Sequence, residues 1–276
     1  MTRKENHFIP NRFHSLDVLR GLAALAVVFF HWRHNFYTGT ASTGFVASNQ
    51  PFYTTLYLFY EEGQKAVELF FTLSGFVFFW LYAKKLKDHS VSLSKFSILR
   101  LSRLYPLHFS TLLTVLILQR IYHSHFNSYF VYAHNDFYHF CLHLFFASNW
   151  GFQRGFSFNG PVWSVSVEIL LYLIFFLICW LKKDTFPVLL LLTLGSYSVF
   201  YYKGYPLCQG IFSFFVGGLT YRVFKSHFHS ILAGWRALMV VSAAVMAWTC
   251  TILEVYTHTL SMQYAGLLDL LSIHPR

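Results

Sequence analysis

Long apolar stretches alternate with short polar ones along the whole chain. Seven of them, each of about 17 to 23 residues with few charges, are predicted to cross a bilayer as helices. They cover residues 16–32, 66–83, 104–121, 162–181, 186–202, 205–224 and 231–253. Two shorter stretches, 137–150 and 260–273, suit an interfacial or re-entrant helix or an incomplete span. The pattern predicts an all-α, polytopic transmembrane bundle of about seven or eight spans, in a single domain over residues 1–276.

Composition excludes a soluble protein. Of the 276 residues, 55% are hydrophobic and only 12% are charged, about half the charged fraction of an ordinary soluble domain. The net charge of +10 would suggest nucleic acid, but these cations lie in short runs between apolar segments rather than on a solvated basic face. We therefore expect membrane lipid, and no nucleic acid, as a partner. The four cysteines have no CxxC spacing, which excludes a cysteine zinc site.

The distribution of lysine and arginine predicts the orientation in the membrane. With a cytoplasmic N-terminus, and with the two short stretches left as non-spanning, 15 of the 21 basic residues lie on the cytoplasmic side. If the assignment of the loops to the two sides is shifted by one span, the basic residues no longer gather on the cytoplasmic side. A spanning segment at 137–150 would reverse the second half of the topology.

The first predicted span carries two ionisable residues on one face. Arg20 and His31 are eleven positions apart, which is about 20° past three full turns and about 16 Å along the axis. A cation at one end and an imidazole at the other suit a ligand with a phosphate at one end and reactive chemistry at the other. The spacing leaves open that Arg20 reaches the headgroups and His31 anchors at the interface.

Paired guanidinium groups follow the second span. Arg100 and Arg103, at i and i+3, project together if their stretch is helical. Such a pair at a cytoplasmic mouth fits phosphate recognition, although it could also serve only as a positively charged anchor. Within the second span, Gly75 favours close approach of another helix.

Two carboxylates fall inside predicted spans, where a charge is costly unless it is paired. Glu68 lies near the outer end of the second span, and Glu168 lies about two turns after Pro161. The topology places both at a depth comparable with His31, and a histidine is the natural partner of a carboxylate there. Glu168 is therefore a candidate functional residue.

Other histidines are weaker candidates. Asp136, His139 and His143 could share one helix face. A polar interfacial face is a better interpretation of that pattern than a metal site. We expect no metal cofactor.

Four segments occur together in a characteristic order and spacing. They are LDVLRGLAALAVVFFHW (16–32), VELFFTLSGFVFFW (67–80), RLSRLYP (100–106) and NGPVWSVSVEILLYL (159–173). Together they resemble the membrane acyltransferase-3 family of bacterial O-acyltransferases, and FFVGGLTY (214–221) is similar to a later FxxG element of that family. The motif-bearing region runs from about 16 to 221, and the resemblance implies a protein of the bacterial inner (plasma) membrane.

The resemblance implies a role for each matching residue. Arg20 and His31 match the family's arginine–histidine signature, in which the histidine is the proposed catalytic base and the arginine is required for activity. Arg100 and Arg103 match its cytoplasmic arginine motif, which is implicated in holding acyl-CoA.

The two carboxylates also match. Glu168 stands at the glutamate of the family's WSxSxE segment, and Glu68 stands where an acidic residue precedes two phenylalanines. On this reading, Glu168 or Glu68 orients the imidazole of His31 and stabilises its protonated form.

The implied function is transfer of an acyl group, with acetyl expected, from cytoplasmic acyl-CoA to a hydroxyl of a carbohydrate or glycolipid, as in polysaccharide O-acetylation. Family members usually have more spans, so we expect a C-terminally short member. The alternatives are an inactive truncated remnant or partner subunit, and a proton-coupled transporter, since intramembrane His and Glu also build proton relays. Acceptor identity, acyl length, direct transfer or an acyl-enzyme, and oligomeric state remain open.

Overall fold

The computed structural model describes residues 14–231, and the chain divides into two compact units, Met1–Tyr221 and Arg222–Arg276. The helical bundle that carries the candidate site belongs to the first unit. The predicted span at 260–273, and all but the first residue of the one at 231–253, lie outside the described residues.

The described residues are mostly helical, and the elements follow one another along the chain with short connections. In order they are α1 (His14–His31), η1 (Trp32–Phe36), β1 (Tyr37–Thr38), β2 (Ala41–Ser42), η2 (Ala47–Asn49), α2 (Tyr53–Glu62), η3 (Gly63–Lys65), α3 (Ala66–Leu81), α4 (Ala83–Lys87), α5 (Leu93–Phe126), α6 (Phe137–Leu144), η4 (Gly160–Val162), α7 (Trp163–Trp180), α8 (Phe186–Lys203) and α9 (Pro206–Ile231). The antiparallel pair β1–β2 is a small departure from the all-α expectation.

Four helical stretches of the described part are long and apolar enough to cross a membrane. They are Tyr53–Leu81, Leu93–Phe126, Gly160–Trp180 and Pro206–Ser226. The predicted spans at 16–32 and 186–202 also form helices, α1 and α8, of 18 residues each. The helical membrane fold is confirmed in this part of the chain, while the total of seven or eight spans and the cytoplasmic N-terminus stay predictions.

The helix that carries the two arginines begins earlier than the predicted span. Ser92 caps α5 by accepting a hydrogen bond from the backbone N–H of Lys95 at 3.3 Å. The helix therefore includes Arg100 and Arg103, which satisfies the condition under which they project together. Residues 137–150 instead give only the eight-residue helix α6, which is about 12 Å long and too short to span a bilayer.

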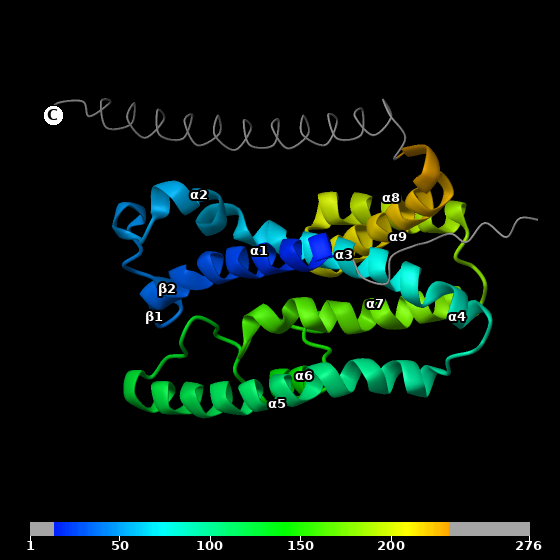
Figure 1. Cartoon of the computed structure of the whole chain (residues 1–276). Coiled ribbons are helices and arrows are strands. Elements are labelled where there is room, and N and C mark those ends of the chain that lie inside the picture. The colour runs from blue at the N-terminus through cyan, green and yellow to red at the C-terminus, as the bar shows by residue number, and fades with distance from the viewer. Residues whose placement is uncertain (1–13, 232–276) are drawn as a thin grey trace, which may run out of the picture. The chain divides into compact units, whose positions relative to one another are not determined.

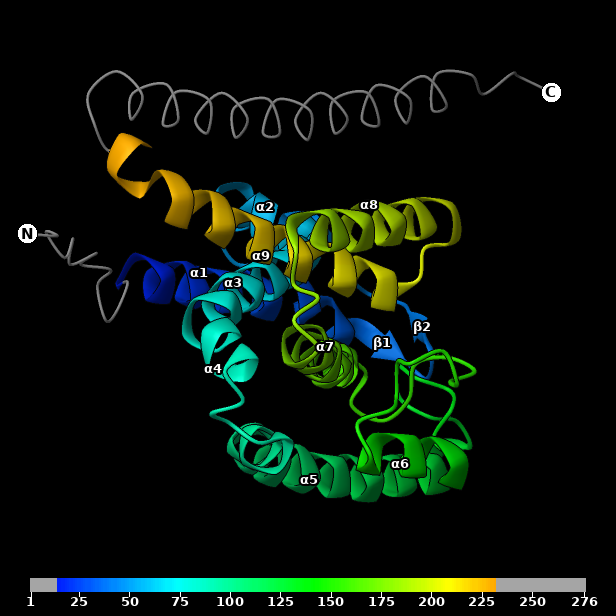
Figure 2. The same cartoon turned by 90° about the vertical axis from the view of Figure 1, so that its right-hand side faces the viewer.

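The bundle is built around α7. Seen end-on, α7 lies between α5 on one side and α3, α8 and α9 on the other (Figure 2). Its buried face packs rings from these helices, and Phe78 of α3 stacks on Tyr172 of α7 with ring centroids 4.5 Å apart. Phe175 and Phe214 are fully buried in the same cluster. Burial of several such rings is the main source of packing energy here.

The basic residues and His31 lie at opposite ends of the bundle. Figure 1 shows α4, the start of α5 and the end of α7 at one end, and η1 with the strand pair at the other. At the first end, Lys87 and Asp184 form an ion pair of 2.9 Å that ties α4 to the segment after α7. The start of α5 brings Arg100 and Arg103 toward this end, whereas His31 ends α1 at the opposite one.

The predicted close helix approach at Gly75 is confirmed. A Cβ added at Gly75 would overlap the backbone of Phe214, and a Cβ at Gly217 would overlap the carbonyl oxygen of Thr72. Helices α3 and α9 thus meet backbone to backbone, which only glycine allows in these two places.

We expect Gly217→Val to destabilise the bundle, because the added side chain forces α3 and α9 apart. Overpacking of this kind costs about 1–3 kcal/mol. The measurement is the thermal unfolding midpoint of the detergent-solubilised protein. Gly195→Val on α8 is the matched control, since a Cβ there meets nothing within 4 Å. Equal midpoints for the two variants would contradict the close α3–α9 contact.

Candidate active site

The end of α1 is held in place by the elements that follow it. Trp32 donates from its indole N–H to Oε1 of Gln50 at 3.0 Å. Arg33 donates to the carbonyl oxygen of Tyr60 at 2.7 Å and to Oε2 of Glu61 at 3.3 Å, both on α2. These contacts fix the position of His31, the last residue of α1.

The ring of His31 has a defined tautomer. Its Nδ1 lies 2.9 Å from the carbonyl oxygen of Val27, one turn back in α1. A carbonyl oxygen only accepts, so Nδ1 carries the hydrogen and Nε2 of the neutral ring keeps its lone pair. The arrangement leaves Nε2 available as a base.

His31 lines a large cavity, here named the His31 cavity, of about 630 Å³. Its walls come from the end of α1, from η1, from the C-terminal half of α5 and from the loops on either side of α6. The lining residues are His31, His34, Val115, Leu118, Gln119, Ile121, Tyr122, His125, Phe126, Phe130, Val131, Tyr132, Phe158, Asn159 and Pro161. This lining contains no lysine, arginine, aspartate or glutamate. The cavity has the size of a small-molecule site and is uncharged while its histidines are neutral.

Two polar side chains of the His31 cavity are kept neutral by their surroundings. Burial lowers the pKa of His34, and the neighbouring His31 and Arg33 lower it further. Burial, with a smaller contribution from Tyr37, raises the pKa of Tyr132 to about 12. Tyr132 packs against Gly160, where a Cβ would lie 2.6 Å from the phenol oxygen. It is therefore a fixed, protonated hydroxyl donor.

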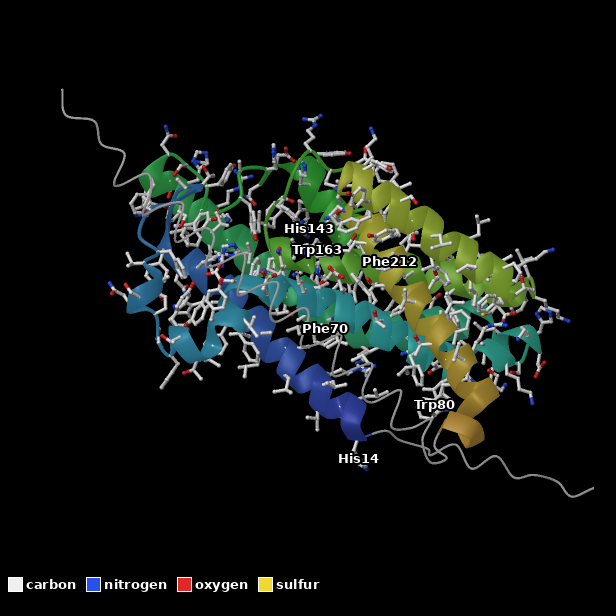
Figure 3. The ribbon with its side chains drawn as sticks, turned by 90° about the horizontal axis from the view of Figure 1, so that it is seen from above. His14, Phe70, Trp80, His143, Trp163 and Phe212 are labelled. Atoms are coloured by element: carbon white, nitrogen blue, oxygen red, sulfur yellow. The ribbon has the colours of Figure 1, made fainter. Side chains whose placement is uncertain are left out.

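A second cavity, here named the Glu168 cavity, has a volume of about 290 Å³ and lies against α1 on the N-terminal side of His31. It is lined by Ala24, Val27, Val67, Phe70, Phe71, Ser74, Ser164 and Glu168. Figure 3 shows Phe70 of α3 and Trp163 at the start of α7 toward the middle of the bundle. Ala24, Val27 and His31 follow Arg20 at four, seven and eleven positions, so one face of α1 runs from Arg20 past this cavity to the His31 cavity.

Glu168 is bound by residues other than His31. Its Oε1 accepts from the hydroxyl of Tyr172, one turn on in α7, and from the hydroxyl of Ser74 on α3 at 3.4 Å. The ring of Tyr172 also lies 5.8 Å from the guanidinium carbon of Arg100. Tyr172 thus links Glu168 to one member of the predicted phosphate-binding pair.

Arg100 is held by aromatic rings. Its guanidinium carbon lies 4.5 Å from the ring centre of Phe78 and 4.7 Å from that of Tyr82. Phe96 and Tyr172 complete the cage at 5.9 and 5.8 Å. Cation–π attraction holds the charge without using the N–H donors, and within the described residues no hydrogen bond to Arg100 is formed. Arg103, three residues on, is exposed.

Glu68 lies at a helix interface. Its Oε1 accepts from Nε2 of Gln209 at 2.7 Å, which links α3 to α9. The family resemblance predicts that Glu168 or Glu68 orients His31. In the described part of the chain the imidazole bonds to Val27 instead, and each carboxylate has a different partner.

Comparison with known proteins shows the family of this chain. A family model for the acyltransferase-3 family, described as an acyltransferase domain, matches residues 13–274. The chain belongs to the acyltransferase-3 family. Acyl transfer is the chemistry after which this family is named.

One relative of this chain is "Protein 2 in picA locus" of Rhizobium radiobacter. The two are 38% identical over 99 residues, which cover 36% of this chain and 41% of the relative. The matched part is thus less than half of that protein. No solved structure matches.

The histidines of α6 in the acyltransferase have structural partners. His139 donates from Nδ1 to Oδ1 of Asp136 at 2.7 Å, and His143 bonds through Nε2 to the hydroxyl of Ser157 at 3.0 Å. His108 of α5 donates to the carbonyl oxygen of His143 at 2.8 Å. Among the residues that the structure describes, no group of three or more His, Cys, Asp or Glu is placed to hold a metal ion.

We expect the protein to lose stability in acid through His143. Burial, together with His108 and His139, lowers its pKa from 6.5 to about 4 despite the bond to Ser157. The stabilisation from the neutral ring is complete above pH 6.5 and is lost as the pH falls toward 4, which amounts to about 3 kcal/mol at most. Thermal unfolding midpoints between pH 7.5 and 4.5 measure it, and His143→Gln should flatten the slope. An unchanged slope in His143→Gln would contradict this origin, and His14→Gln, at an exposed position, is the control.

Several residues of the His31 cavity were not singled out from sequence. His34 follows His31 at i+3, and this HxxH spacing was the one available signal. Gln119, Tyr132 and Asn159 lie in loops or in the middle of an apolar helix, where no pattern distinguishes them. The tertiary fold alone gathers them around His31.

Proposed function

We propose that this chain is an integral membrane O-acyltransferase that transfers an acyl group, with acetyl expected, from cytoplasmic acyl-CoA to a hydroxyl of a carbohydrate or glycolipid. The observation that carries the proposal is the placement of His31, whose Nδ1 bonds to the carbonyl oxygen of Val27 and whose ring lines a cavity without lysine, arginine, aspartate or glutamate. A bacterial inner membrane and acetyl-CoA as donor are part of the proposal.

The donor phosphates bind at Arg100 and Arg103. The aromatic cage leaves the N–H donors of Arg100 for phosphate oxygens. Glu168 bonds to the hydroxyls of Tyr172 and Ser74, and the ring of Tyr172 forms part of the cage around Arg100. In this proposal Glu168 is a positioning residue, because it acts on Arg100 through Tyr172.

The thioester reaches His31 along α1. Arg103 and Gln119 are sixteen residues apart on α5, about 24 Å along the axis. The phosphate end and the reacting end of the donor are therefore well separated, and the Glu168 cavity lies against the α1 face that connects them. Arg20, one turn before Ala24, lies on the same face of α1. It binds the donor at the cytoplasmic end of this path.

The chemistry at His31 is general-base catalysis. Nε2 takes the proton of the acceptor hydroxyl while the oxygen of that hydroxyl attacks the carbonyl carbon of the thioester. The new C–O bond forms, the C–S bond breaks, and the proton passes to the leaving thiolate to give free CoA and an ester.

The test is acetyl transfer from radiolabelled acetyl-CoA in membranes that contain the full 276-residue chain. We expect label in an alkali-labile ester of endogenous glycan or glycolipid, above the level of membranes without the chain. The absence of such label, with the protein folded and inserted, would contradict the proposal and favour an inactive subunit.

A further inference from the structure

The His31 cavity is larger than the reaction alone requires. An acetyl group and one hydroxyl fill a small part of about 630 Å³, which is enough for a whole small-molecule ligand. The remaining volume has to be filled by the body of the acceptor. The residues that line the cavity therefore indicate the chemistry of the acceptor.

The lining has two kinds of side chain. The neutral polar groups, among them His34, Tyr132 and Asn159, gather with His31 at the loops and at η1. On α5 the apolar Val115, Leu118 and Ile121 alternate with Gln119, Tyr122 and His125. Both polar atoms of Gln119 are bonded to the backbone of Phe130. No basic residue is present for a phosphate or carboxylate, so a charged acceptor group would be buried there without a partner.

The apolar wall is also part of the outer surface of the bundle. Leu118 is 57% exposed and Ile121 is 53% exposed, although both line the cavity. Only 11% of the most apolar stretch of α5 is buried inside the bundle, against 44% of the corresponding stretch that contains α7. In a membrane such an apolar surface faces lipid. The cavity is therefore continuous with the lipid-facing side of α5.

We infer that the acceptor is a membrane lipid-borne molecule, with an uncharged hydroxyl-bearing head joined to an apolar chain, that enters the His31 cavity sideways past Leu118 and Ile121 of α5. The head meets the polar groups around His31, and the chain lies against α5. This inference rests on the proposed acyltransferase function and specifies its acceptor class.

The experiment compares two acceptors with the same sugar in proteoliposomes made without glycoside detergent. Methyl β-glucoside and dodecyl β-glucoside, the latter below its micelle concentration, receive label from radiolabelled acetyl-CoA. We expect about tenfold or more ester on the dodecyl compound, since burial of only two methylenes is worth roughly that factor.

A variant pair separates entry past α5 from simple partitioning into the membrane. Leu118→Trp narrows the entrance and should reduce the ratio of dodecyl to methyl glucoside acetylation about fivefold or more. Leu107→Trp is the matched control, because Leu107 is on the same helix, is 72% exposed and does not line the cavity.

The possible outcomes distinguish a failure of the acceptor inference from a failure of the proposed acyltransferase function. Equal rates for the two glucosides, or a Leu118→Trp effect no greater than that of Leu107→Trp, would overturn lateral entry and leave the acyltransferase proposal standing. No ester on either glucoside, with label still released from acetyl-CoA as acetate in a His31-dependent reaction, would overturn the acceptor class. No His31-dependent consumption of acetyl-CoA at all would overturn the proposed function itself.

Discussion

His31→Ala is expected to lower acyl transfer by about 10²–10⁴-fold, the usual contribution of a general base. The carbonyl oxygen of Val27 accepts the Nδ1 hydrogen of His31, so Nε2 is the nitrogen left to act as the base in the cavity. Alanine removes the only group of α1 in that cavity that can take a proton from the acceptor. The measurement is the initial rate of ester formation from labelled acetyl-CoA in proteoliposomes, with the amount of inserted protein determined for each variant.

The control for this prediction lies on the same helix. His14 begins α1 and is exposed, and Figure 3 shows its side chain pointing away from the bundle. His14→Ala should keep the wild-type rate. His34→Ala tests a second histidine of the cavity. The ring centres of His34 and His31 are 5.3 Å apart. Full loss in His34→Ala with activity retained in His31→Ala would assign the base to His34 instead.

The sequence predicted the helices and their faces well, because both follow from local rules. Periodicity and apolar length locate α1, α7 and α8 within a few residues of the structure. The eleven-residue spacing of Arg20 and His31 is a property of one helix, and Ala24 and Val27 show that this face borders the cavities. The roles of these residues in catalysis stay predictions.

The partners of the carboxylates could not be predicted in the same way. Depth in the membrane places Glu168 near the level of His31, but it does not say which way the side chain points around the axis of α7. Tyr172 at i+4 was visible in the sequence and takes the carboxylate. The pairing of Glu68 with Gln209 spans 141 positions, and the packing of α3 on α9 alone determines it.

The His31 cavity depends on tertiary structure even more strongly. Its wall joins the end of α1 to α5 and to the loops on either side of α6, which share no periodic pattern. The aromatic cage of Arg100 likewise combines α3, α5 and α7 with Tyr82. In a chain where 21% of residues are aromatic, no single ring could be assigned to the cage beforehand.

Arg100→Ala is expected to raise the KM for acetyl-CoA by about 10- to 100-fold, the worth of a hydrogen bond from a charged donor. The maximal rate should change much less, because Arg100 lies in the first part of α5, where the proposal places the donor phosphates, whereas His31 ends α1. Arg100→Lys keeps the charge but loses the planar fork that pairs with phosphate and stacks on Phe78 and Tyr82. Its KM should therefore lie between the wild-type and alanine values.

Arg154→Lys is the matched control for the arginine series, since Arg154 also stacks on a ring, that of Tyr138 at 5.5 Å, but lies in the loop after α6. It should leave the KM unchanged. A structural role of Arg100 would lower the amount of folded protein and the maximal rate without moving the KM. A shift in KM alone, which is largest for alanine and absent in Arg154→Lys, separates donor binding from packing, because only the former depends on acetyl-CoA concentration.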